Sequence, residues 1–366
     1  MSVASKTMDK RQRLVGIDLL RGLAIYGVVI LHTDQGIQLL PDAWLMIRQF
    51  AAFAVPFFLA TSFYLTANKL YAGKPYRLSS RFTRLFVPYA FWSAFYLLYR
   101  FLKYLAIHEL SRAIQLVHDP ISIAFFGGAA FHLYFLPLLL TGTLLMKLGE
   151  WLIQKQASLR LLVTLTFISF WVYEIVLGTG NMVDISAGLA FQPFLNFIVS
   201  TGNQNQILRV LLVEFAWAIR CLPYVLFAIV LTHPKVTPYL KAWINHALPI
   251  WLLAFLIINF LGNQLLPDAV HDVSRGFTAL LLALSLSDHL QENSIVQNLG
   301  FCSLGIYLIH LLFVETAQTI WVRLNPGHIN QVSTLTLFAV SVVIFLVSWG
   351  AVILLLRYKP IAKVLI

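Results

Sequence analysis

Long apolar stretches separated by short polar segments make up most of this chain. Stretches of about 20 mainly apolar residues are long enough to cross a bilayer as helices. We expect them at residues 14–33, 44–68, 85–107, 121–146, 160–178, 207–232, 242–263, 272–290, 298–320 and 332–356. Hydrophobic residues make up 59% of the sequence and charged residues 11%, which excludes a soluble enzyme. The pattern predicts an all-α fold, a polytopic bundle of about ten transmembrane helices in which residues 1–366 form a single membrane domain.

The segment 185–200 is the least regular part of this pattern. It is apolar, but it is short and contains Gln192, Pro193 and Asn196. We expect a re-entrant or interfacial piece on the outer side of the membrane. If the segment crosses the membrane instead, every later span changes sides.

The distribution of basic residues indicates the orientation. Of the 26 Lys and Arg residues, 17 fall on the side that holds the N-terminus and seven on the other, while Arg21 and Arg220 lie inside spans. Because cytoplasmic segments are enriched in Lys and Arg, both termini are predicted to be cytoplasmic. The net charge of +11 has the same origin and does not indicate nucleic-acid binding. The expected partner of this multi-pass protein is the lipid bilayer.

The first span carries ionisable residues among its apolar ones. Asp18 and Arg21 are three residues apart and can pair on a helix. His32 follows Arg21 by eleven residues, which is about 16 Å along a helix axis and within about 20° of the same direction. Arg21 and His32 therefore share a face near opposite ends of the span. Ionisable groups inside a span indicate a functional site, although a snorkelling Arg and an interfacial His are the simpler alternative.

Four sequence fragments occur in order along the chain. The first, D-L-L-R-G-L-A…V-V-I-L-H, holds Arg21 and His32 with ten residues between them. The others are RFTRLFVPY at 81–89, FHLYFLP at 131–137 and GFCSLGIYLIH at 300–310. Together they resemble the motifs of acyltransferase family 3, with Tyr134 at a place where Trp is usual. Proteins of this family are integral membrane enzymes that acylate hydroxyls of bacterial glycans and related substrates.

The resemblance implies roles for these residues. His32 would be the base that deprotonates the acceptor hydroxyl, Arg21 would position the donor or its thioester, and Asp18 would fix Arg21. Arg81 and Arg84 would bind the phosphates of an acyl-CoA donor, or would only anchor their span at the cytoplasmic surface. The pocket candidates are His132, Tyr134, Tyr307 and His310; His132 and His310 are otherwise polar residues satisfied within the bundle.

Arg220 lies deep inside the sixth span, where an unpaired Arg is costly. It needs an anion, for which Glu214, Glu174 or a ligand phosphate are the candidates, and we count it among the cofactor-binding residues. Three acidic residues are expected to be interfacial charges: Asp34, Asp288 and Glu315.

Other catalytic motifs are absent from the sequence. His108 and Glu109 are followed by Arg112 where a zinc-binding H-E-x-x-H motif requires His, so no metal is expected. The sequence has no glycine-rich phosphate loop, no C-x-x-C pair and no G-x-S-x-G nucleophile elbow. Cys221 and Cys302 both fall in apolar stretches and imply no disulfide.

We therefore expect an acyltransferase that moves a short acyl group from acyl-CoA, such as acetyl-CoA, to a hydroxyl of a carbohydrate or glycan-lipid in the bacterial inner membrane. The alternative is a glycan transporter or flippase without acyl chemistry, because intramembrane Arg and His also suit a translocation path. The inverted repeat that would favour a transporter is not visible in the sequence. The other large superfamily of membrane-bound O-acyltransferases fits less well, since its His lies late in the chain.

The charge asymmetry predicts a cytoplasmic location for the 69–84 loop and for both termini. In sealed cells, a cysteine placed at Lys74 and a C-terminal tag should both be protected from an impermeant reagent and react only after permeabilisation. The unsubstituted protein, with Cys221 and Cys302 in apolar stretches, gives the background. Labelling of either position from outside would contradict this topology.

Overall fold

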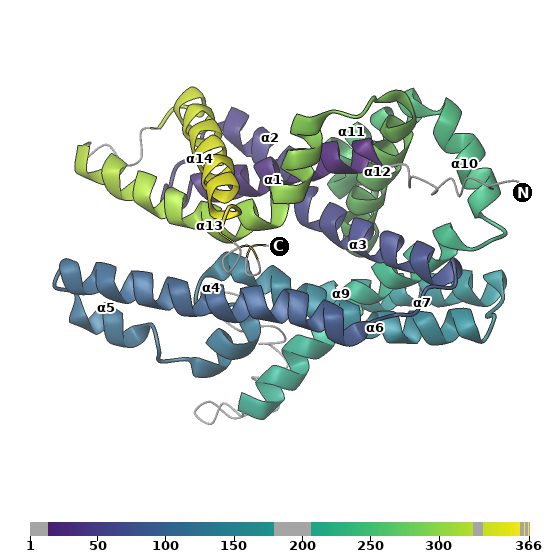
Figure 1. Ribbon diagram of the computed structural model, residues 1–366, viewed down its shortest axis with the longest axis horizontal. Coiled ribbons are helices and arrows are strands. Elements are labelled where there is room, and N and C mark those ends of the chain that lie inside the picture. Colours follow the sequence, from purple (N-terminus) through teal and green to yellow (C-terminus); the bar gives the residue numbers. More distant parts are fainter. Residues whose placement is uncertain (1–13, 179–205, 325–331, 359–361, 363–364, 366) are drawn as a thin grey trace, which may run out of the picture.

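The computed structural model describes residues 14–178, 206–324 and 332–358, together with Ala362 and Leu365. Within these residues the regular structure is helical and contains no strand (Figure 1). In this part of the chain, ten helical segments are long and apolar enough to cross a membrane. The predicted all-α transmembrane bundle is thus confirmed. The segment 185–200, expected to re-enter the membrane, lies outside the described residues.

The helices follow the order of the apolar stretches. Their bounds are α1 Val15–Thr33, α2 Asp42–Ala51, α3 Ala54–Tyr71, α4 Leu78–Ala106, α5 Leu110–Gln115, α6 Phe135–Gln154, α7 Leu159–Gly178, α9 Gln206–Thr232, α10 Thr237–His246, α11 Leu248–Leu265, α12 Asp268–His289, α13 Ser294–Leu324 and α14 Thr334–Leu355. A π turn, η1 Ser122–Phe126, and a 3-10 turn, η2 Phe131–Tyr134, precede α6.

Prolines account for two interruptions that the apolar pattern does not show. The expected span 44–68 is divided into α2 and α3, because Pro56 near the start of α3 has no N–H to donate to a preceding carbonyl. Within the expected span 242–263, one helix, the short α10, ends at His246 and α11 begins at Leu248. Pro249 lies in the first turn of α11, where proline is well tolerated.

A glycine moves the start of the fourth span. Gly127 has a φ of +79°, a backbone conformation that glycine adopts most readily. A Cβ atom at this position would lie 2.4 Å from the backbone nitrogen of Tyr134. The apolar helical segment therefore runs over Phe131–Gln154, and not over 121–146 as expected. This places His132 in the first turn of the segment.

The bundle has two halves (Figure 1). In one, α1 packs against α13, α12 and α3, with further contacts to α14 and α2. In the other, α6 packs against α4 and α9, and α7 against α9. The two halves meet where α3 contacts α9 and α6. Because α7, α11 and α14 bury few of their apolar side chains, their outer faces are suited to lipid.

Helix α4 lies along the front of the second half and contains Pro88. Because Pro88 has no N–H, the backbone hydrogen bond that residue 88 would donate to the Arg84 carbonyl oxygen is missing. The helix nevertheless continues from Leu78 to Ala106.

Glycines allow the central helices to approach closely. A Cβ atom at Gly16 would lie 2.0 Å from the Ala283 carbonyl oxygen of α12, and one at Gly276 would lie 2.4 Å from the Pro56 carbonyl oxygen of α3. Small residues at helix interfaces permit this packing in membrane proteins. The contacts fix α1, α3 and α12 relative to one another.

Replacing Gly276 by Ala should lower the stability of the protein, because the added methyl group meets backbone atoms that cannot move aside easily. Overpacking of this kind costs about 1–3 kcal/mol. Gly350→Ala in α14 is the matched control, since a Cβ atom there meets nothing within 4 Å. Thermal unfolding in detergent should show a lower Tm for Gly276→Ala and an unchanged or higher Tm for Gly350→Ala. Equal Tm values would contradict the packing described here.

Candidate functional site

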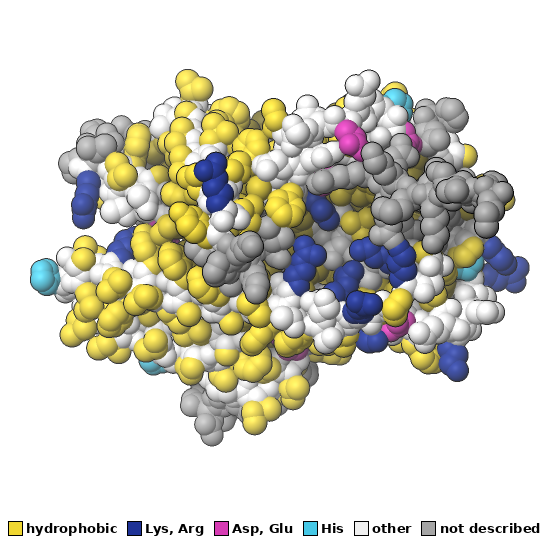
Figure 2. Space-filling model, viewed as in Figure 1, with side chains coloured by type: hydrophobic (Ala, Val, Ile, Leu, Met, Phe, Trp, Pro, Cys, Tyr) yellow, Lys and Arg dark blue, Asp and Glu magenta, His cyan; other side chains and the backbone are white. Residues whose placement is uncertain are grey.

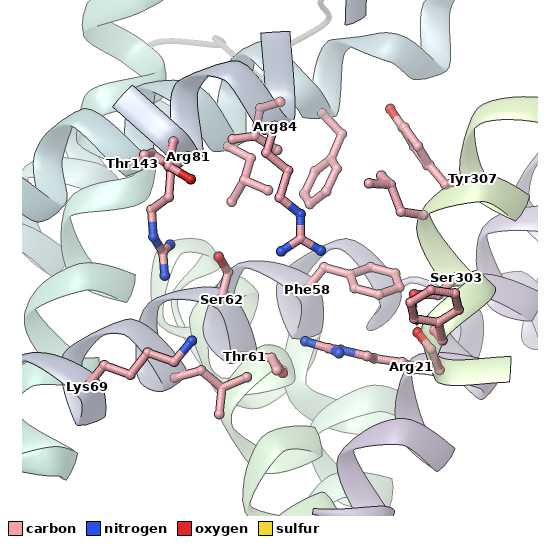
Figure 3. A pocket seen from close by; sticks show the side chains of 18 residues that line it. Arg21, Phe58, Thr61, Ser62, Lys69, Arg81, Arg84, Thr143, Ser303 and Tyr307 are labelled. Carbon is pink, nitrogen blue, oxygen red and sulfur yellow. Dashed lines mark hydrogen bonds between the residues drawn. The ribbon is translucent and has the colours of Figure 1, made fainter. Parts of the chain in front are cut away.

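A cavity of about 440 Å³ lies between α1, α3, α4, α6 and α13 (Figure 3). Its lining combines basic, hydroxyl and apolar side chains in one space. The basic members are Arg21, Lys69, Arg81 and Arg84, and the hydroxyl-bearing ones are Thr61, Ser62, Ser80, Thr143, Ser303 and Tyr307. The remaining residues are Phe58, Leu65, Leu85, Phe135, Leu139, Gly300, Phe301 and Leu304.

The four basic side chains come from three helices and point into the same space (Figure 3). Figure 2 shows Lys and Arg side chains gathered between α3 and α4 on a face that is otherwise largely hydrophobic. None of the eighteen described residues that line the cavity is acidic. Positive charges held together in a partly dehydrated space favour a ligand with several negative charges. We call this space the cationic cavity.

Tyr76 fixes the start of α4. The Arg81 guanidinium lies over the Tyr76 ring, 5.3 Å from its centroid. The Tyr76 hydroxyl donates to the Thr143 carbonyl oxygen at 2.7 Å, and its backbone N–H donates to the Glu150 carboxylate at 3.2 Å. Burial raises the pKa of Tyr76 to about 12, so its hydroxyl stays protonated as a hydrogen-bond donor at neutral pH. These contacts hold the Arg81–Arg84 turn against α6.

Asp18 supports Arg21 from the same helix. The expected pairing is present as a long ion pair, with 4.0 Å between Arg21 Nη1 and Asp18 Oδ1. The Asp18 side chain is buried, while that of Arg21 reaches the cavity. A Cβ atom at Gly300 of α13 would lie 2.6 Å from Asp18 Oδ1, so this glycine makes room for the carboxylate.

Three histidine rings lie close together outside the lining of the cationic cavity. The His310 ring lies 5.4 Å from the His32 ring in a stacked arrangement and 5.1 Å from the His132 ring in an edge-to-face one. The Phe131 ring packs edge-on against His32 at 4.8 Å. We call His32, His132 and His310 the histidine cluster. In the described part of the chain, no three His, Cys, Asp or Glu side chains are placed to hold a metal ion.

Tyr307 joins the two regions. It lines the cationic cavity, and its ring lies 5.3 Å from His132 and 6.3 Å from His310. Its hydroxyl donates a hydrogen bond to the His132 carbonyl oxygen. Phe135, another lining residue, packs against Tyr307 at 5.8 Å. The cavity and the histidine cluster therefore adjoin one another at Tyr307.

An ion pair next to His32 fixes the end of α1. Asp34 is buried and accepts hydrogen bonds from the Trp44 indole at 2.7 Å and from the Arg48 guanidinium. Both donors belong to α2. Asp34 was expected to be an interfacial charge, but it ties α2 to the residues that follow His32. The sequence gives no direct signal for this contact.

A second pair holds α4 to α13. Arg100 Nη2 lies 2.5 Å from Glu315 Oε1, and Arg100 Nη1 donates to the Ala129 carbonyl oxygen at 3.0 Å. Close by, the Tyr96 hydroxyl donates to the Leu308 carbonyl oxygen at 2.8 Å. Glu315, also expected to be an interfacial charge, therefore anchors the part of α4 that lies beyond Pro88.

Arg220 and Tyr134 do not line the cationic cavity. Arg220 Nη2 lies 3.2 Å from Asp272 Oδ1, and the hydroxyls of Tyr173 and Tyr224 donate to the same carboxylate at 3.2 and 2.9 Å. Tyr134 interacts with Arg220 from the neighbouring turn η2. The carboxylate of Asp272 thus stands where we considered a ligand phosphate.

The other two expected partners of Arg220 have different contacts. Glu214 accepts a hydrogen bond from the Thr141 hydroxyl at 2.7 Å. Glu174 accepts from the backbone N–H of Ala269 at 2.8 Å, at the start of α12. Carboxylates stabilise helix N-termini in this way. The partner of Arg220 was not predictable from spacing, because Asp272 is on another span.

The structure brings together most, but not all, of the residues predicted from sequence. Arg21, Arg81, Arg84 and Tyr307 line the cationic cavity, His32, His132 and His310 form the histidine cluster, and Asp18 supports Arg21. Sequence reasoning missed Lys69, which it counted only among the cytoplasmic basic residues, and it did not consider Tyr76. Their position before the R-x-x-R turn is the signal that could have suggested them.

Comparison with known proteins supports the motif resemblance. The profile of acyltransferase family 3, described as an acyltransferase domain, matches residues 14–354. No curated protein and no solved structure matches the chain significantly. The family match covers nearly the whole chain, including the cationic cavity and the histidine cluster. The chain therefore belongs to acyltransferase family 3 and is a membrane acyltransferase.

Proposed function

We propose that this acyltransferase moves a short acyl group, acetyl in the simplest case, from acyl-CoA to a hydroxyl of a carbohydrate or glycan-lipid. The observation that carries the proposal is the succession of cationic cavity, Tyr307 and histidine cluster within one site. It provides positive charge for an anionic donor at one end and imidazole bases at the other.

The cationic cavity suits the donor. Coenzyme A carries phosphates joined to a long, uncharged pantetheine arm that ends in the thioester. Arg side chains bind phosphates through paired hydrogen bonds, and Lys adds a compact charge. The phenyl rings of Phe58, Phe135 and Phe301 give the rest of the cavity an apolar lining for the arm.

The spacing along α1 fits an extended arm. Arg21 lines the cavity and His32 belongs to the histidine cluster, about 16 Å further along the helix axis. Both side chains adjoin α13, as expected for residues that share a face of α1. With the phosphates near Arg81 and Arg84, the thioester would lie close to Tyr307. The predicted topology opens the basic end to the cytoplasm, where acyl-CoA is made.

The transfer needs one proton to move from the acceptor to the leaving group. His32 accepts the proton of the acceptor hydroxyl as its oxygen attacks the thioester carbonyl carbon. The new C–O bond forms, the C–S bond breaks, and the imidazolium returns the proton to the departing CoA thiolate. No covalent acyl-enzyme is required.

Replacing both Arg81 and Arg84 by Gln should raise the KM for acetyl-CoA more than it lowers kcat, because the phosphate contacts act in the ground state. The control is Lys74→Gln with Arg77→Gln, which removes the same charge from exposed residues of the same segment that do not line the cavity. Initial rates with labelled acetyl-CoA in membranes give KM and kcat for each double variant. An unchanged KM in correctly inserted Arg81/Arg84 protein would leave these residues with an anchoring role alone.

His32→Ala should abolish acyl transfer and leave donor binding intact, because a base acts in the transition state. Loss of a general base lowers the rate by about 10²–10⁴-fold. Arg21→Ala should weaken donor binding as well, and Arg21→Lys should restore it only in part, since Lys keeps the charge but not the planar guanidinium. Transfer of label from [¹⁴C]acetyl-CoA to glycans, with CoA binding measured in parallel, separates the two residues.

The same assay tests the function itself. Wild-type membranes should label a glycan fraction, and mass spectrometry should find the matching ester in cells that contain the protein. A His32→Ala protein that transfers label at the wild-type rate would falsify the mechanism. Wild-type membranes that export glycan without labelling it would favour the transporter.

A further inference from the structure

The hydrogen bonds of His310 determine which of its ring nitrogens carries the proton. Nδ1 lies 2.7 Å from the Tyr307 carbonyl oxygen and 3.2 Å from that of Ile306. A carbonyl oxygen can only accept, so Nδ1 must be the protonated nitrogen. In the neutral ring Nε2 then carries a lone pair and is a hydrogen-bond acceptor.

This acceptor has no partner among the described residues. His310 is fully buried, and Nε2 makes no hydrogen bond within that part of the chain. A buried polar atom without a hydrogen bond is unfavourable, and native proteins contain few of them. A polar atom left in this state inside a reaction site is suited to a ligand group that donates a hydrogen bond.

The neighbours of His310 indicate where that ligand lies. Its ring is stacked against His32, the proposed base, and its own turn of α13 carries Tyr307, which lines the cationic cavity. His32 is partly exposed, whereas His310 is covered. His310 is therefore the imidazole stacked behind the proposed base, and His132, whose ring nitrogens also have no hydrogen bond among the described residues, lies beyond it.

We propose that His310 binds the acceptor substrate by accepting, through Nε2, a hydrogen bond from a second hydroxyl adjacent to the one that His32 deprotonates. This inference rests on the proposed function and narrows the acceptor class. The two stacked imidazoles, with ring centroids 5.4 Å apart, each take one hydroxyl of a neighbouring pair. The preferred acceptor is then a sugar unit or other polyol with adjacent free hydroxyls, and an isolated alcohol is a poor substrate.

The two nitrogens of His310 can be tested separately. His310→Asn keeps an N–H donor at the position of Nδ1 and removes Nε2. The chain already holds an Asn in this arrangement, because Asn259 Nδ2 donates to the Phe255 carbonyl oxygen, four residues earlier in its helix, at 2.7 Å. His310→Gln places an amide acceptor near the position of Nε2 and removes the donor to Tyr307. The pair therefore separates a structural role of His310 from substrate binding.

A control outside the site measures the effect of the substitution alone. His289 Nδ1 makes the same kind of contact, to the Ser285 carbonyl oxygen four residues earlier. His289 is on α12 and does not belong to the histidine cluster. His289→Asn should leave transfer and stability close to those of the wild type. Thermal unfolding of all variants in detergent shows whether each folds.

The assay uses the full chain in membranes, with [¹⁴C]acetyl-CoA and glycans extracted from cells that lack the protein. For His310→Asn we expect kcat/KM for the glycan to fall about tenfold or more, with the KM for acetyl-CoA unchanged, because a substrate hydroxyl loses its acceptor. His310→Gln should retain more activity than His310→Asn. With monosaccharide glycosides as acceptors, removing the hydroxyl next to the acetylated one should slow the wild type but not His310→Asn.

Other outcomes overturn the inference. A folded His310→Asn protein with wild-type kinetics, or one that is more active than His310→Gln, would assign His310 a structural role in α13. Equal sensitivity of wild type and His310→Asn to the deoxy acceptor would exclude contact with the second hydroxyl. If wild-type membranes transfer no acetyl group, both the proposed function and this inference fail. If the wild type is active and substitution of His310 has no effect on its kinetics, only this inference fails.

Discussion

Arginine–carboxylate pairs inside the bundle are the interaction on which this structure depends. A charged side chain in a low-dielectric interior is costly unless an opposite charge lies close to it. Three pairs join helices that are distant in sequence or separated by a turn: Asp34–Arg48, Arg100–Glu315 and Arg220–Asp272. Together they connect α1 to α2, α4 to α13 and α9 to α12, and thereby set the frame around the site. The cationic cavity differs from these pairs, because its basic side chains face a space with no acidic residue in its described lining.

The site divides into a charged half and an uncharged half, with Tyr307 between them. For the proposed substrates, the phosphates of acyl-CoA and the hydroxyls of the acceptor would need different environments. The first require fixed cations, and the second require neutral hydrogen-bond acceptors that can take a proton. Helix α13 contributes residues to both parts of the site, since Ser303 and Tyr307 line the cationic cavity and His310, one turn later, belongs to the histidine cluster. A single helix therefore sets the distance between the cationic cavity and the histidine cluster.

The features that depend on local order were predictable from the sequence. The apolar stretches predicted the helices, and the spacing of Arg21 and His32 predicted that both lie on one face of the first span. Contacts between distant segments were not predictable, because no local rule links Arg220 to Asp272, or Glu315 to Arg100. Helix ends also differed where Pro56, Pro249 and Gly127 interrupt an apolar stretch. An apolar stretch reports the preference of side chains for lipid, whereas these residues act through the backbone.

The proline in α4 divides this helix into two mechanically different parts. Beyond Pro88, Tyr96 and Arg100 hold the helix to α13. Before it, the contacts of Tyr76 hold the Arg81–Arg84 turn against α6, with both Arg side chains in the cationic cavity. The missing hydrogen bond at Pro88 makes bending there easier than elsewhere along α4. A bend at this point would move the α6-bound start of the helix relative to α13, and so change the width of the cavity between them. The width of the cationic cavity thus depends on one angle in one helix, and substitutions outside the cavity lining can alter it.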